Sequence, residues 1–149
     1  MTALAMSPAR SRAEFDEEPT SIIATLGGLI RGPSVVVNED TPLAEVRRLL
    51  VELRVPAVAV VDSHDNLRGL VTRTDVIRVI EADARAIDAM SGFVFALPVS
   101  ASIEKAAALM AYEGVGQVVV TSRTGTLLGM VSAIDIVRHF AITAGHLAR

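Results

Sequence analysis

The sequence predicts a mixed α/β (α+β) protein in which one β-α-β-β-α unit occurs twice. When the chain is compared with itself, residues 32–80 align with residues 92–140 without a gap. Within each copy, short β-branched runs alternate with apolar residues at helical spacing, which is the pattern of strands connected by amphipathic helices. A fixed period indicates that one structural unit was made twice and that neither copy need be complete alone.

The first half of copy one predicts a strand followed by a helix. Residues 35–37 are consecutive valines, a composition typical of strands. Thr41 is a candidate N-cap, and Pro42 suits the first position of a helix. Apolar residues then recur every three or four positions over residues 43–53, so we expect an amphipathic helix there.

The second half of copy one predicts a hairpin followed by a second helix. Residues 58–61 are an apolar run, turn-forming residues follow at 62–66, and residues 67–71 resume the strand pattern. The second helix is expected from Arg73 to about residue 82. Copy two repeats this order, with expected strands at 95–97, 118–121 and 127–131 and expected helices at 102–113 and through Phe140. Hairpins pair antiparallel whereas a crossover through a helix favours parallel pairing, so each small sheet should be mixed.

Composition excludes several classes of function. The chain has 149 residues, of which 51% are hydrophobic, so it can bury a sizeable core. A net charge of -3, four Phe, one Tyr and no Trp provide neither the basic surface nor the stacking aromatics of a nucleic-acid-binding protein. The absence of cysteine excludes disulfides, thiolate metal ligands and a cysteine nucleophile.

The sequence also predicts where the protein works. No run approaches the ~18 apolar residues that a membrane span requires, and residues 1–19 lack the apolar core of a signal peptide. We therefore expect a soluble, cytoplasmic protein that binds neither membrane nor nucleic acid.

The chain is expected to divide into two repeats with polar flanks. Residues 1–19 lack periodicity and should be a disordered N-terminal tail, and residues 21–30 suit a short helix. The expected parts after the tail are repeat one at 20–82, a linker at 83–90, repeat two at 91–143 and a C-terminal tail at 144–149. The seam between the repeats is the expected functional surface.

A short polar signature ends each copy. Residues 69–75 read Gly-Leu-Val-Thr-Arg-Thr-Asp, and residues 129–135 read Gly-Met-Val-Ser-Ala-Ile-Asp. One interpretation is a capping box, in which a hydroxyl and the carboxylate three residues later satisfy the first amides of a helix. The other is a ribose clamp, because an ionised aspartate accepts hydrogen bonds from two neighbouring hydroxyls. In that interpretation the glycine lets another group approach the backbone closely.

With these motifs the chain resembles the tandem cystathionine β-synthase (CBS) domain pair, or Bateman module, over about residues 22–143. The resemblance rests on Ala89-Met90 before copy two, on RVPAVAVVD at residues 54–62, and on the order and spacing of GLVTRTD and GMVSAID. It implies two β-α-β-β-α CBS repeats packed through their sheets about a pseudo-twofold axis. It also implies a homodimer, and two clefts that bind adenosine-containing ligands such as AMP, ADP, ATP or S-adenosylmethionine.

The resemblance assigns ligand-binding residues to each cleft. One cleft would join Ser132 and Asp135 to residues of copy one, namely Val36, Val37, Val55, Pro56 and Ala57. The other would join Thr72 and Asp75 to residues of copy two, namely Ala96, Leu97, Val115, Gly116 and Gln117. Phosphate-binding members often carry basic residues before the second strand, and here Arg54 and Arg73 are the nearest substitutes. Because Ala133 and Ile134 replace Arg73 and Thr74, we expect two unequal sites, with the Asp135 site short of cations.

These patterns lead to one main functional hypothesis and two others. We expect a regulatory module that senses an adenine nucleotide or nucleoside, requires no cofactor, and signals by conformational change to an unidentified protein in trans. The first alternative is an interaction or dimerisation scaffold that keeps the fold but binds no nucleotide. The second is a regulatory subunit whose residues 1–19 dock a partner enzyme.

Other side chains that resemble chemical motifs receive simpler interpretations. The sequence shows no Ser-His-Asp order with a nucleophile elbow and no paired carboxylates in an evident pocket, so we expect no catalytic residues. His64 should lie in a solvated hairpin, and His139 and His146 lack the third ligand of a metal site. Arg78 and Arg138 should form exposed ion pairs or cover apolar surface.

Overall fold

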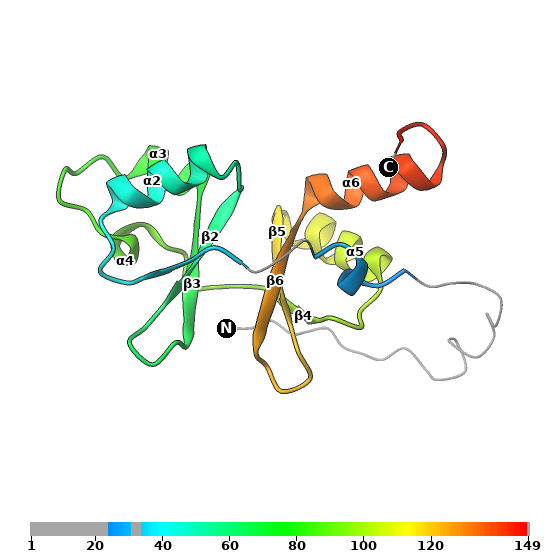
Figure 1. The fold of residues 1–149 in the computed structure, drawn as a ribbon, viewed down its shortest axis with the longest axis horizontal. Helices are drawn as coiled ribbons and strands as arrows, with labels where there is room; N and C mark the ends of the chain where they lie inside the picture. The colour runs from blue at the N-terminus through cyan, green and yellow to red at the C-terminus, as the bar shows by residue number, and fades with distance from the viewer. Residues whose placement is uncertain (1–23, 31–33, 149) are drawn as a thin grey trace. The chain divides into compact units, whose positions relative to one another are not determined.

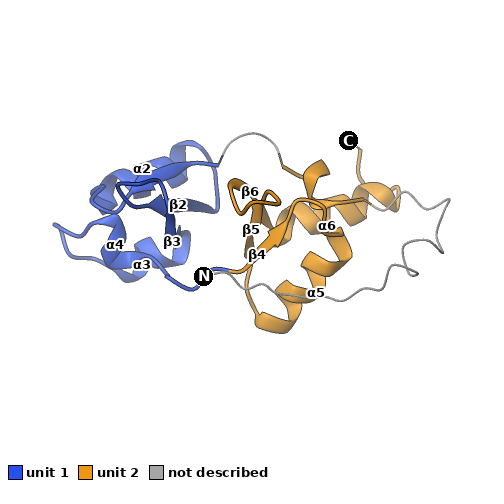
Figure 2. Ribbon diagram, turned by 90° about the horizontal axis from the view of Figure 1, so that it is seen from below, with its two compact units in different colours: residues 1, 34–94 blue, residues 2–33, 95–149 orange. Residues whose placement is uncertain are grey.

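The computed structural model describes residues 24–30 and 34–148, which form two compact units (Figure 1 and Figure 2). Unit 1 comprises residues 34–94, and unit 2 comprises residues 95–148 together with residues 24–30. Each unit contains the predicted β-α-β-β-α order, so the mixed α/β (α+β) fold is confirmed. The tail expected at residues 1–19 lies outside the described residues. No helix in the described ranges has the length and apolar character needed to cross a membrane.

Unit 1 is built on a three-stranded mixed sheet. Its strands are β1 (Val36–Asn38), β2 (Ala57–Val61) and β3 (Leu67–Thr72), and its helices are α2 (Leu43–Glu52), α3 (Arg73–Arg78) and α4 (Ala86–Ala89). Strand β2 lies in the centre, parallel to β1 and antiparallel to β3. Val58, Val60 and Val71 pack with the apolar face of α2 in one buried cluster. The alternation along β2 and β3 therefore directs one face of the sheet toward the helices.

Unit 2 repeats this architecture. Its strands are β4 (Ala96–Pro98), β5 (Gln117–Thr121) and β6 (Leu127–Ser132), and its helices are η1 (Leu26–Gly28), α5 (Ile103–Glu113) and α6 (Ala133–Thr143). The order β4-β5-β6 again combines a parallel and an antiparallel pair. Val118, Val120 and Val131 form a core with α5 and with Leu26 of η1. Figure 1 shows α5 and α6 covering one side of this sheet.

Each unit is completed by the segment that precedes the other copy in the sequence. Within unit 1, Leu43 N donates to Ala84 O at 2.8 Å and Ala86 N donates to Thr41 O at 2.8 Å. Within unit 2, Ile103 N donates to Ala24 O at 3.2 Å and Leu26 N donates to Ala101 O at 2.9 Å. The two sets of bonds are equivalent, because each residue of one set lies sixty positions from its counterpart in the other. The segment expected to link the repeats therefore belongs to the core of unit 1, where Ala84, Ala86 and Ala89 are buried.

The second helix of copy one is shorter than predicted. We expected it to reach about residue 82, but α3 ends at Arg78 and Val79 is already extended. Residues 79–84 must bring the chain from α3 to the position where Leu43 N donates to Ala84 O. They leave the helix at Val79 and then turn, with Ala84 N donating to Glu81 O at 3.2 Å. In unit 2 no such return is needed because the equivalent segment comes from the N-terminal side of the chain. Helix α6 accordingly continues to Thr143.

Two local predictions about copy one also need correction. Pro42, not Thr41, is the N-cap of α2, and the Thr41 hydroxyl instead accepts a hydrogen bond from Asn38 N at 3.1 Å. The hydroxyl is therefore used to close the turn after β1. Leu53, expected on the apolar face, lies beyond the end of α2 and is exposed.

The hairpin between β2 and β3 is exposed, as expected for His64. Its turn is closed by Asp62, whose Oδ1 accepts hydrogen bonds from His64 N at 2.8 Å and Asn66 N at 2.9 Å. These two amide donors, Asn66 first, lower the pKa of Asp62 because they stabilise its charged form. The carboxylate thus has a structural role in the turn.

The glycine of each signature is required by packing inside its own unit. Leu70 N donates to Ser91 O at 3.1 Å, and Ser91 N donates to Leu70 O at 2.9 Å. A Cβ on Gly69 would lie 2.2 Å from that Ser91 oxygen. A Cβ on Gly129 would lie 2.8 Å from Ile30 Cγ2, the end of a flexible side chain. The groups that approach these glycines closely are thus parts of this chain.

We predict that Gly69→Ala destabilises the protein more than Gly129→Ala does. The first substitution forces apart two backbones that are hydrogen-bonded, and overpacking of this kind costs about 2–3 kcal/mol. The second displaces a side-chain methyl that can rotate, so we expect about 1 kcal/mol or less. Urea denaturation followed by circular dichroism measures both. Equal losses for the two variants would contradict this explanation of the glycines.

Candidate functional site

The hydroxyl and the aspartate of each signature lie at a junction between a strand and a helix. Strand β3 ends at Thr72 where α3 begins, and β6 ends at Ser132 where α6 begins. Thr72 and Ser132 are the N-caps, and Asp75 and Asp135 occupy the third helical position. Both copies form a complete capping box, which confirms the first interpretation of the signature.

In copy one the carboxylate of Asp75 is fully engaged. Its Oδ2 accepts hydrogen bonds from Thr72 N at 2.8 Å and from Thr72 Oγ1 at 3.0 Å. Its Oδ1 accepts a hydrogen bond from an Arg78 guanidinium nitrogen at 2.6 Å. The side chain is only 10% exposed. Both oxygens of Asp75 are therefore satisfied by neighbours at the same helix.

In copy two the carboxylate of Asp135 is more open. Its Oδ2 accepts a hydrogen bond from Ser132 N at 2.8 Å, and Asp135 N donates to Ser132 Oγ at 3.1 Å. Its Oδ1 forms an ion pair with Arg138 at 3.6 Å, which is longer than a hydrogen bond. The side chain is 28% exposed. Within the described part of the chain, Oδ1 of Asp135 has no closer partner, so it can accept a hydrogen bond from a ligand.

The arginines shared by the two copies pair with the shared aspartates. Arg78 and Arg138 each lie three residues after the aspartate of their own signature. This confirms the expectation of exposed ion pairs. The same residue types thus give a tight pair in unit 1 and a loose pair in unit 2.

The segment before the central strand lies beside the signature of its own copy. Gln117 is directly opposite Ser132 in the antiparallel pair β5–β6, and Ala133 N donates to Gly116 O at 2.9 Å. Ala57 is likewise opposite Thr72. Gln117 Oε1 is buried and has no hydrogen-bond partner within the described residues. It is an acceptor near the Ser132 junction whose hydrogen-bonding capacity is unused.

The remaining candidate residues fall into two groups by exposure. Core positions, whose side chains pack with the helices of their unit, are Val37, Val55, Leu97 and Val115. More accessible positions are Val36, Pro56, Ala96, Arg54 and Arg73. The cleft groups expected from the resemblance each draw on both units, so their assembly stays a prediction.

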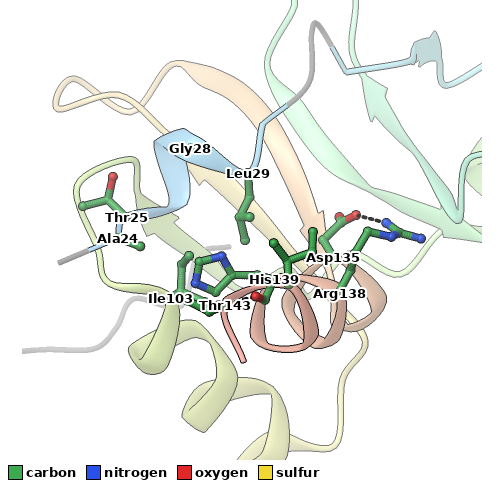
Figure 3. A pocket seen from close by; sticks show the side chains of 10 residues that line it. Ala24, Thr25, Gly28, Leu29, Ile103, Asp135, Arg138, His139 and Thr143 are labelled. Carbon is green, nitrogen blue, oxygen red and sulfur yellow. Dashed lines mark hydrogen bonds and ion pairs between the residues drawn. The ribbon is translucent and has the colours of Figure 1, made fainter. Parts of the chain in front are cut away.

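Unit 2 contains a pocket of about 450 Å³ that the sequence analysis did not anticipate (Figure 3). One wall comes from the segment around η1, with Ala24, Thr25, Gly28 and Leu29. The facing wall is one side of α6, with Asp135, Arg138, His139, Ile142 and Thr143, and Ile103 of α5 completes the lining. The recurrence of these α6 residues at three- and four-residue spacing was visible in the sequence. Their partner across the pocket was not, because residues 24–29 lie far away in the chain.

Three further expectations can be compared with the described residues. Arg138 lines the same pocket as Asp135, but the cleft expected to be short of cations draws on both units, so that expectation stays a prediction. Residues 27–28 do not form the expected longer helix over 21–30, since among the described residues of that range only Leu26–Gly28 are helical. His146 lies after the end of α6 at Thr143, so it does not share a helix face with His139. No group of three metal-ligating side chains occurs in residues 24–30 and 34–148.

Comparison with solved structures shows the same fold in other CBS proteins. The CBS domain pair of protein MJ0100, in complex with 5-methylthioadenosine and S-adenosyl-L-methionine, matches with a TM-score of 0.75 and 19% identity, covering 81% of this chain and 98% of that one. CBS domain protein PAE2072 from Pyrobaculum aerophilum, complexed with AMP, matches with a TM-score of 0.73 and 21% identity over 82% and 97% of the two chains. The CBS-domain containing protein ATU1752 from Agrobacterium tumefaciens gives a TM-score of 0.72 and 20% identity over 79% and 94%.

Comparison with curated sequences and family models agrees with this. An uncharacterized protein of Methanocaldococcus jannaschii is 28% identical over 107 residues, which cover 68% of this chain and 25% of that relative. The chain thus spans about a quarter of the length of the curated relative that it matches. The family model of the CBS domain matches twice, at residues 26–82 and 84–142. The chain therefore belongs to the CBS domain family and carries two consecutive CBS domains.

Proposed function

We propose that this chain is a regulatory module that binds an adenosine-containing small molecule and transmits binding as a change in its own conformation. The observation that carries this proposal is the open carboxylate of Asp135 at the N-terminus of α6. The similarity to CBS pairs solved with AMP or with S-adenosyl-L-methionine supports the ligand class. Two sites are proposed, with the Ser132 and Asp135 site as the stronger one.

The chemistry of the Ser132 junction suits a ribose. Oδ2 of Asp135 is held by Ser132 N, so the carboxylate is already oriented. Among the residues that the structure describes, Oδ1 has only the loose pair with Arg138, so it can accept a ribose hydroxyl in a charge-assisted hydrogen bond. Gln117, opposite Ser132 in the sheet, has a buried amide oxygen with no hydrogen-bond partner in the described part of the chain. The cap thus orients the aspartate, and a ligand uses the oxygen that the cap leaves open.

Backbone strain at Arg54 supports a role for this side chain. Arg54 has φ of 55°, in the left-handed region, shortly before β2. The equivalent position in copy two is Gly114, with φ of 70°. A non-glycine residue in this conformation costs of order 1–3 kcal/mol and is often retained for function. We propose that Arg54, with Arg73, contacts the phosphate groups of a nucleotide.

A ligand that contacts both domains would signal by a population shift. Its binding favours one arrangement of the chain only by its differential affinity for that arrangement. We propose that the responding protein is a separate chain in the cytoplasm. The proposed role of this chain is regulatory and does not include catalysis.

A second copy of this chain is the proposed partner for the signature helices. Ile77 and Ile80, on and just after α3, and the equivalent Val137 and Phe140 of α6 are all exposed, from 41% for Phe140 to 81% for Ile80. Exposed apolar rows are unfavourable in water. Because each unit presents such a row at equivalent positions, a symmetric homodimer that pairs these helices would remove the rows from water.

The scaffold alternative is favoured by one observation. Both capping boxes are complete without any ligand, and both oxygens of Asp75 are occupied. Copy one can therefore be explained by helix capping alone, so the nucleotide proposal depends most on copy two.

We predict that AMP, ADP, ATP or S-adenosylmethionine stabilises the protein and that Asp135→Asn weakens the effect. The variant keeps an acceptor for Ser132 N but loses the charge that strengthens a bond to ribose, so affinity should fall about tenfold or more. Asp75→Asn is the matched control and should change affinity less. Thermal shift and calorimetry measure both. Silence toward all four ligands and NAD at millimolar concentration would contradict the sensing proposal and favour the scaffold alternative.

We predict that Arg54→Gly raises stability but weakens binding of ATP and ADP. The substitution removes a left-handed strain worth about 1–2 kcal/mol together with the guanidinium. Asp65→Gly is the matched control, because Asp65 also has a positive φ, of 65°, but lies in the exposed hairpin. It should change stability without changing nucleotide affinity. Unchanged nucleotide affinity in Arg54→Gly would show that this arginine does not contact phosphate.

We predict a dimer in solution that Val137→Lys or Ile77→Lys converts to a monomer, because a charged side chain cannot be buried in an apolar interface without a large cost. Tyr112→Lys is the control, since Tyr112 is exposed on α5 outside the signature helices. Light scattering after size exclusion gives the mass of each variant. A monomeric wild-type protein would refute the proposed dimer.

A further inference from the structure

The pocket of unit 2 has an apolar body and a polar end (Figure 3). Leu29, Ile103 and Ile142 contribute aliphatic surface. Asp135 and Arg138 lie next to each other at one end, with His139 beside them on α6. Thr143 donates its hydroxyl to the backbone carbonyl of His139, and Thr25 adds a hydroxyl to the wall around η1, so the charged groups of the lining are Asp135 and Arg138. A volume of about 450 Å³ lies within the range of small-molecule sites.

In unit 1 the position equivalent to this pocket is filled by side chains of the core. In the repeat alignment Val79 corresponds to His139, and Ala84 corresponds to Ala24. Both Val79 and Ala84 pack in the core of unit 1, because residues 79–84 form the covalent connection from α3 to α4. In unit 2 the chain instead continues along α6, and η1 is supplied from residues 24–30. The pocket is thus a consequence of the missing connection.

The ion pair between the arginine and the aspartate is looser in unit 2 than in unit 1, which leaves its groups available to a ligand. Arg78 and Asp75 are 2.6 Å apart, whereas Arg138 and Asp135 are 3.6 Å apart and more evenly exposed. The loose pair leaves one carboxylate oxygen and a guanidinium edge available at the end of the apolar lining. A negative and a positive group side by side complement a molecule that carries both an ammonium and a carboxylate.

We propose that this pocket binds a free α-amino acid with an apolar side chain. The ammonium group donates to Oδ1 of Asp135, and the carboxylate accepts from Arg138 in a charge-assisted pair. The side chain packs against Leu29, Ile103 and Ile142, where burial of apolar surface drives binding. The inference does not rest on the adenosine proposal, because the pocket lies entirely within unit 2 and requires no nucleotide. Since both proposals use Oδ1 of Asp135, an amino acid and an adenosine-containing ligand would compete for this oxygen.

Calorimetric titration of the full chain with L-leucine, without nucleotide, tests the proposal. We expect saturable binding with a dissociation constant below about 10 mM. Isocaproate, which lacks the ammonium group, and isopentylamine, which lacks the carboxylate, should each bind at least about tenfold more weakly. L-Aspartate, whose side chain is charged, should not bind. Equal affinity for isocaproate and L-leucine would overturn the assignment to amino acids.

Two variants locate the binding. Gly28 lines the pocket, and a Cβ there meets no atom of the described residues within 4 Å, so Gly28→Leu is designed to obstruct the pocket, with Gly92→Leu in unit 1 as its control. Arg138→Gln should weaken L-leucine binding about tenfold or more, whereas Arg78→Gln in unit 1 should leave it unchanged. Circular dichroism checks that each variant is folded. No binding of L-leucine to the wild-type protein, or binding that both unit 2 variants retain in full, would overturn the proposal.

Discussion

The reciprocal hydrogen bonds of the two capping boxes determine where each signature helix begins and how its aspartate is oriented. In each copy the strand runs directly into the helix, so the hydroxyl and the carboxylate stand at the edge of the sheet. The cap uses one carboxylate oxygen, and the arginine one turn later determines whether the other oxygen is free. Capping and ligand binding are therefore compatible in copy two, although the sequence motif presents them as alternatives. The difference between the copies depends on the length of one ion pair, 2.6 Å in copy one and 3.6 Å in copy two.

A second constraint follows from the exchange of leading segments. Residues 84–89 complete the core of unit 1, and residues 24–30 complete unit 2. This exchange ends α3 early, opens the pocket beside α6, and requires glycine at position 69, where Ser91 pairs with β3. Neither copy is a closed unit by itself, so any change in the path of one leading segment alters the packing of the other copy. Such coupling suits a module that converts binding into a conformational response.

The sequence predicted the elements whose signals are local, and it did not predict features that depend on distant contacts. The valine runs and the hydroxyl-to-aspartate spacing indicated the strands and both caps, because these patterns depend on neighbours within a few residues. The predicted end of α3 was wrong because Ile80 continues the helical spacing in the sequence although it is exposed in the structure. The hydrogen bond from Leu43 N to Ala84 O instead determines the path of the chain after α3. Thr41 resembled a cap but closes a turn. The pocket depends on residues 24–29 meeting α6, for which no local pattern exists.

The central claim is that Asp135 offers a carboxylate oxygen that Asp75 does not. Carbon-13 spectra of the aspartate carboxyl groups during titration of the full chain with AMP measure this directly, one residue at a time. We expect a saturable shift of the Asp135 carboxyl resonance that is clearly larger than that of Asp75. A shift confined to Asp75, or no shift at either aspartate at saturating AMP, would contradict it.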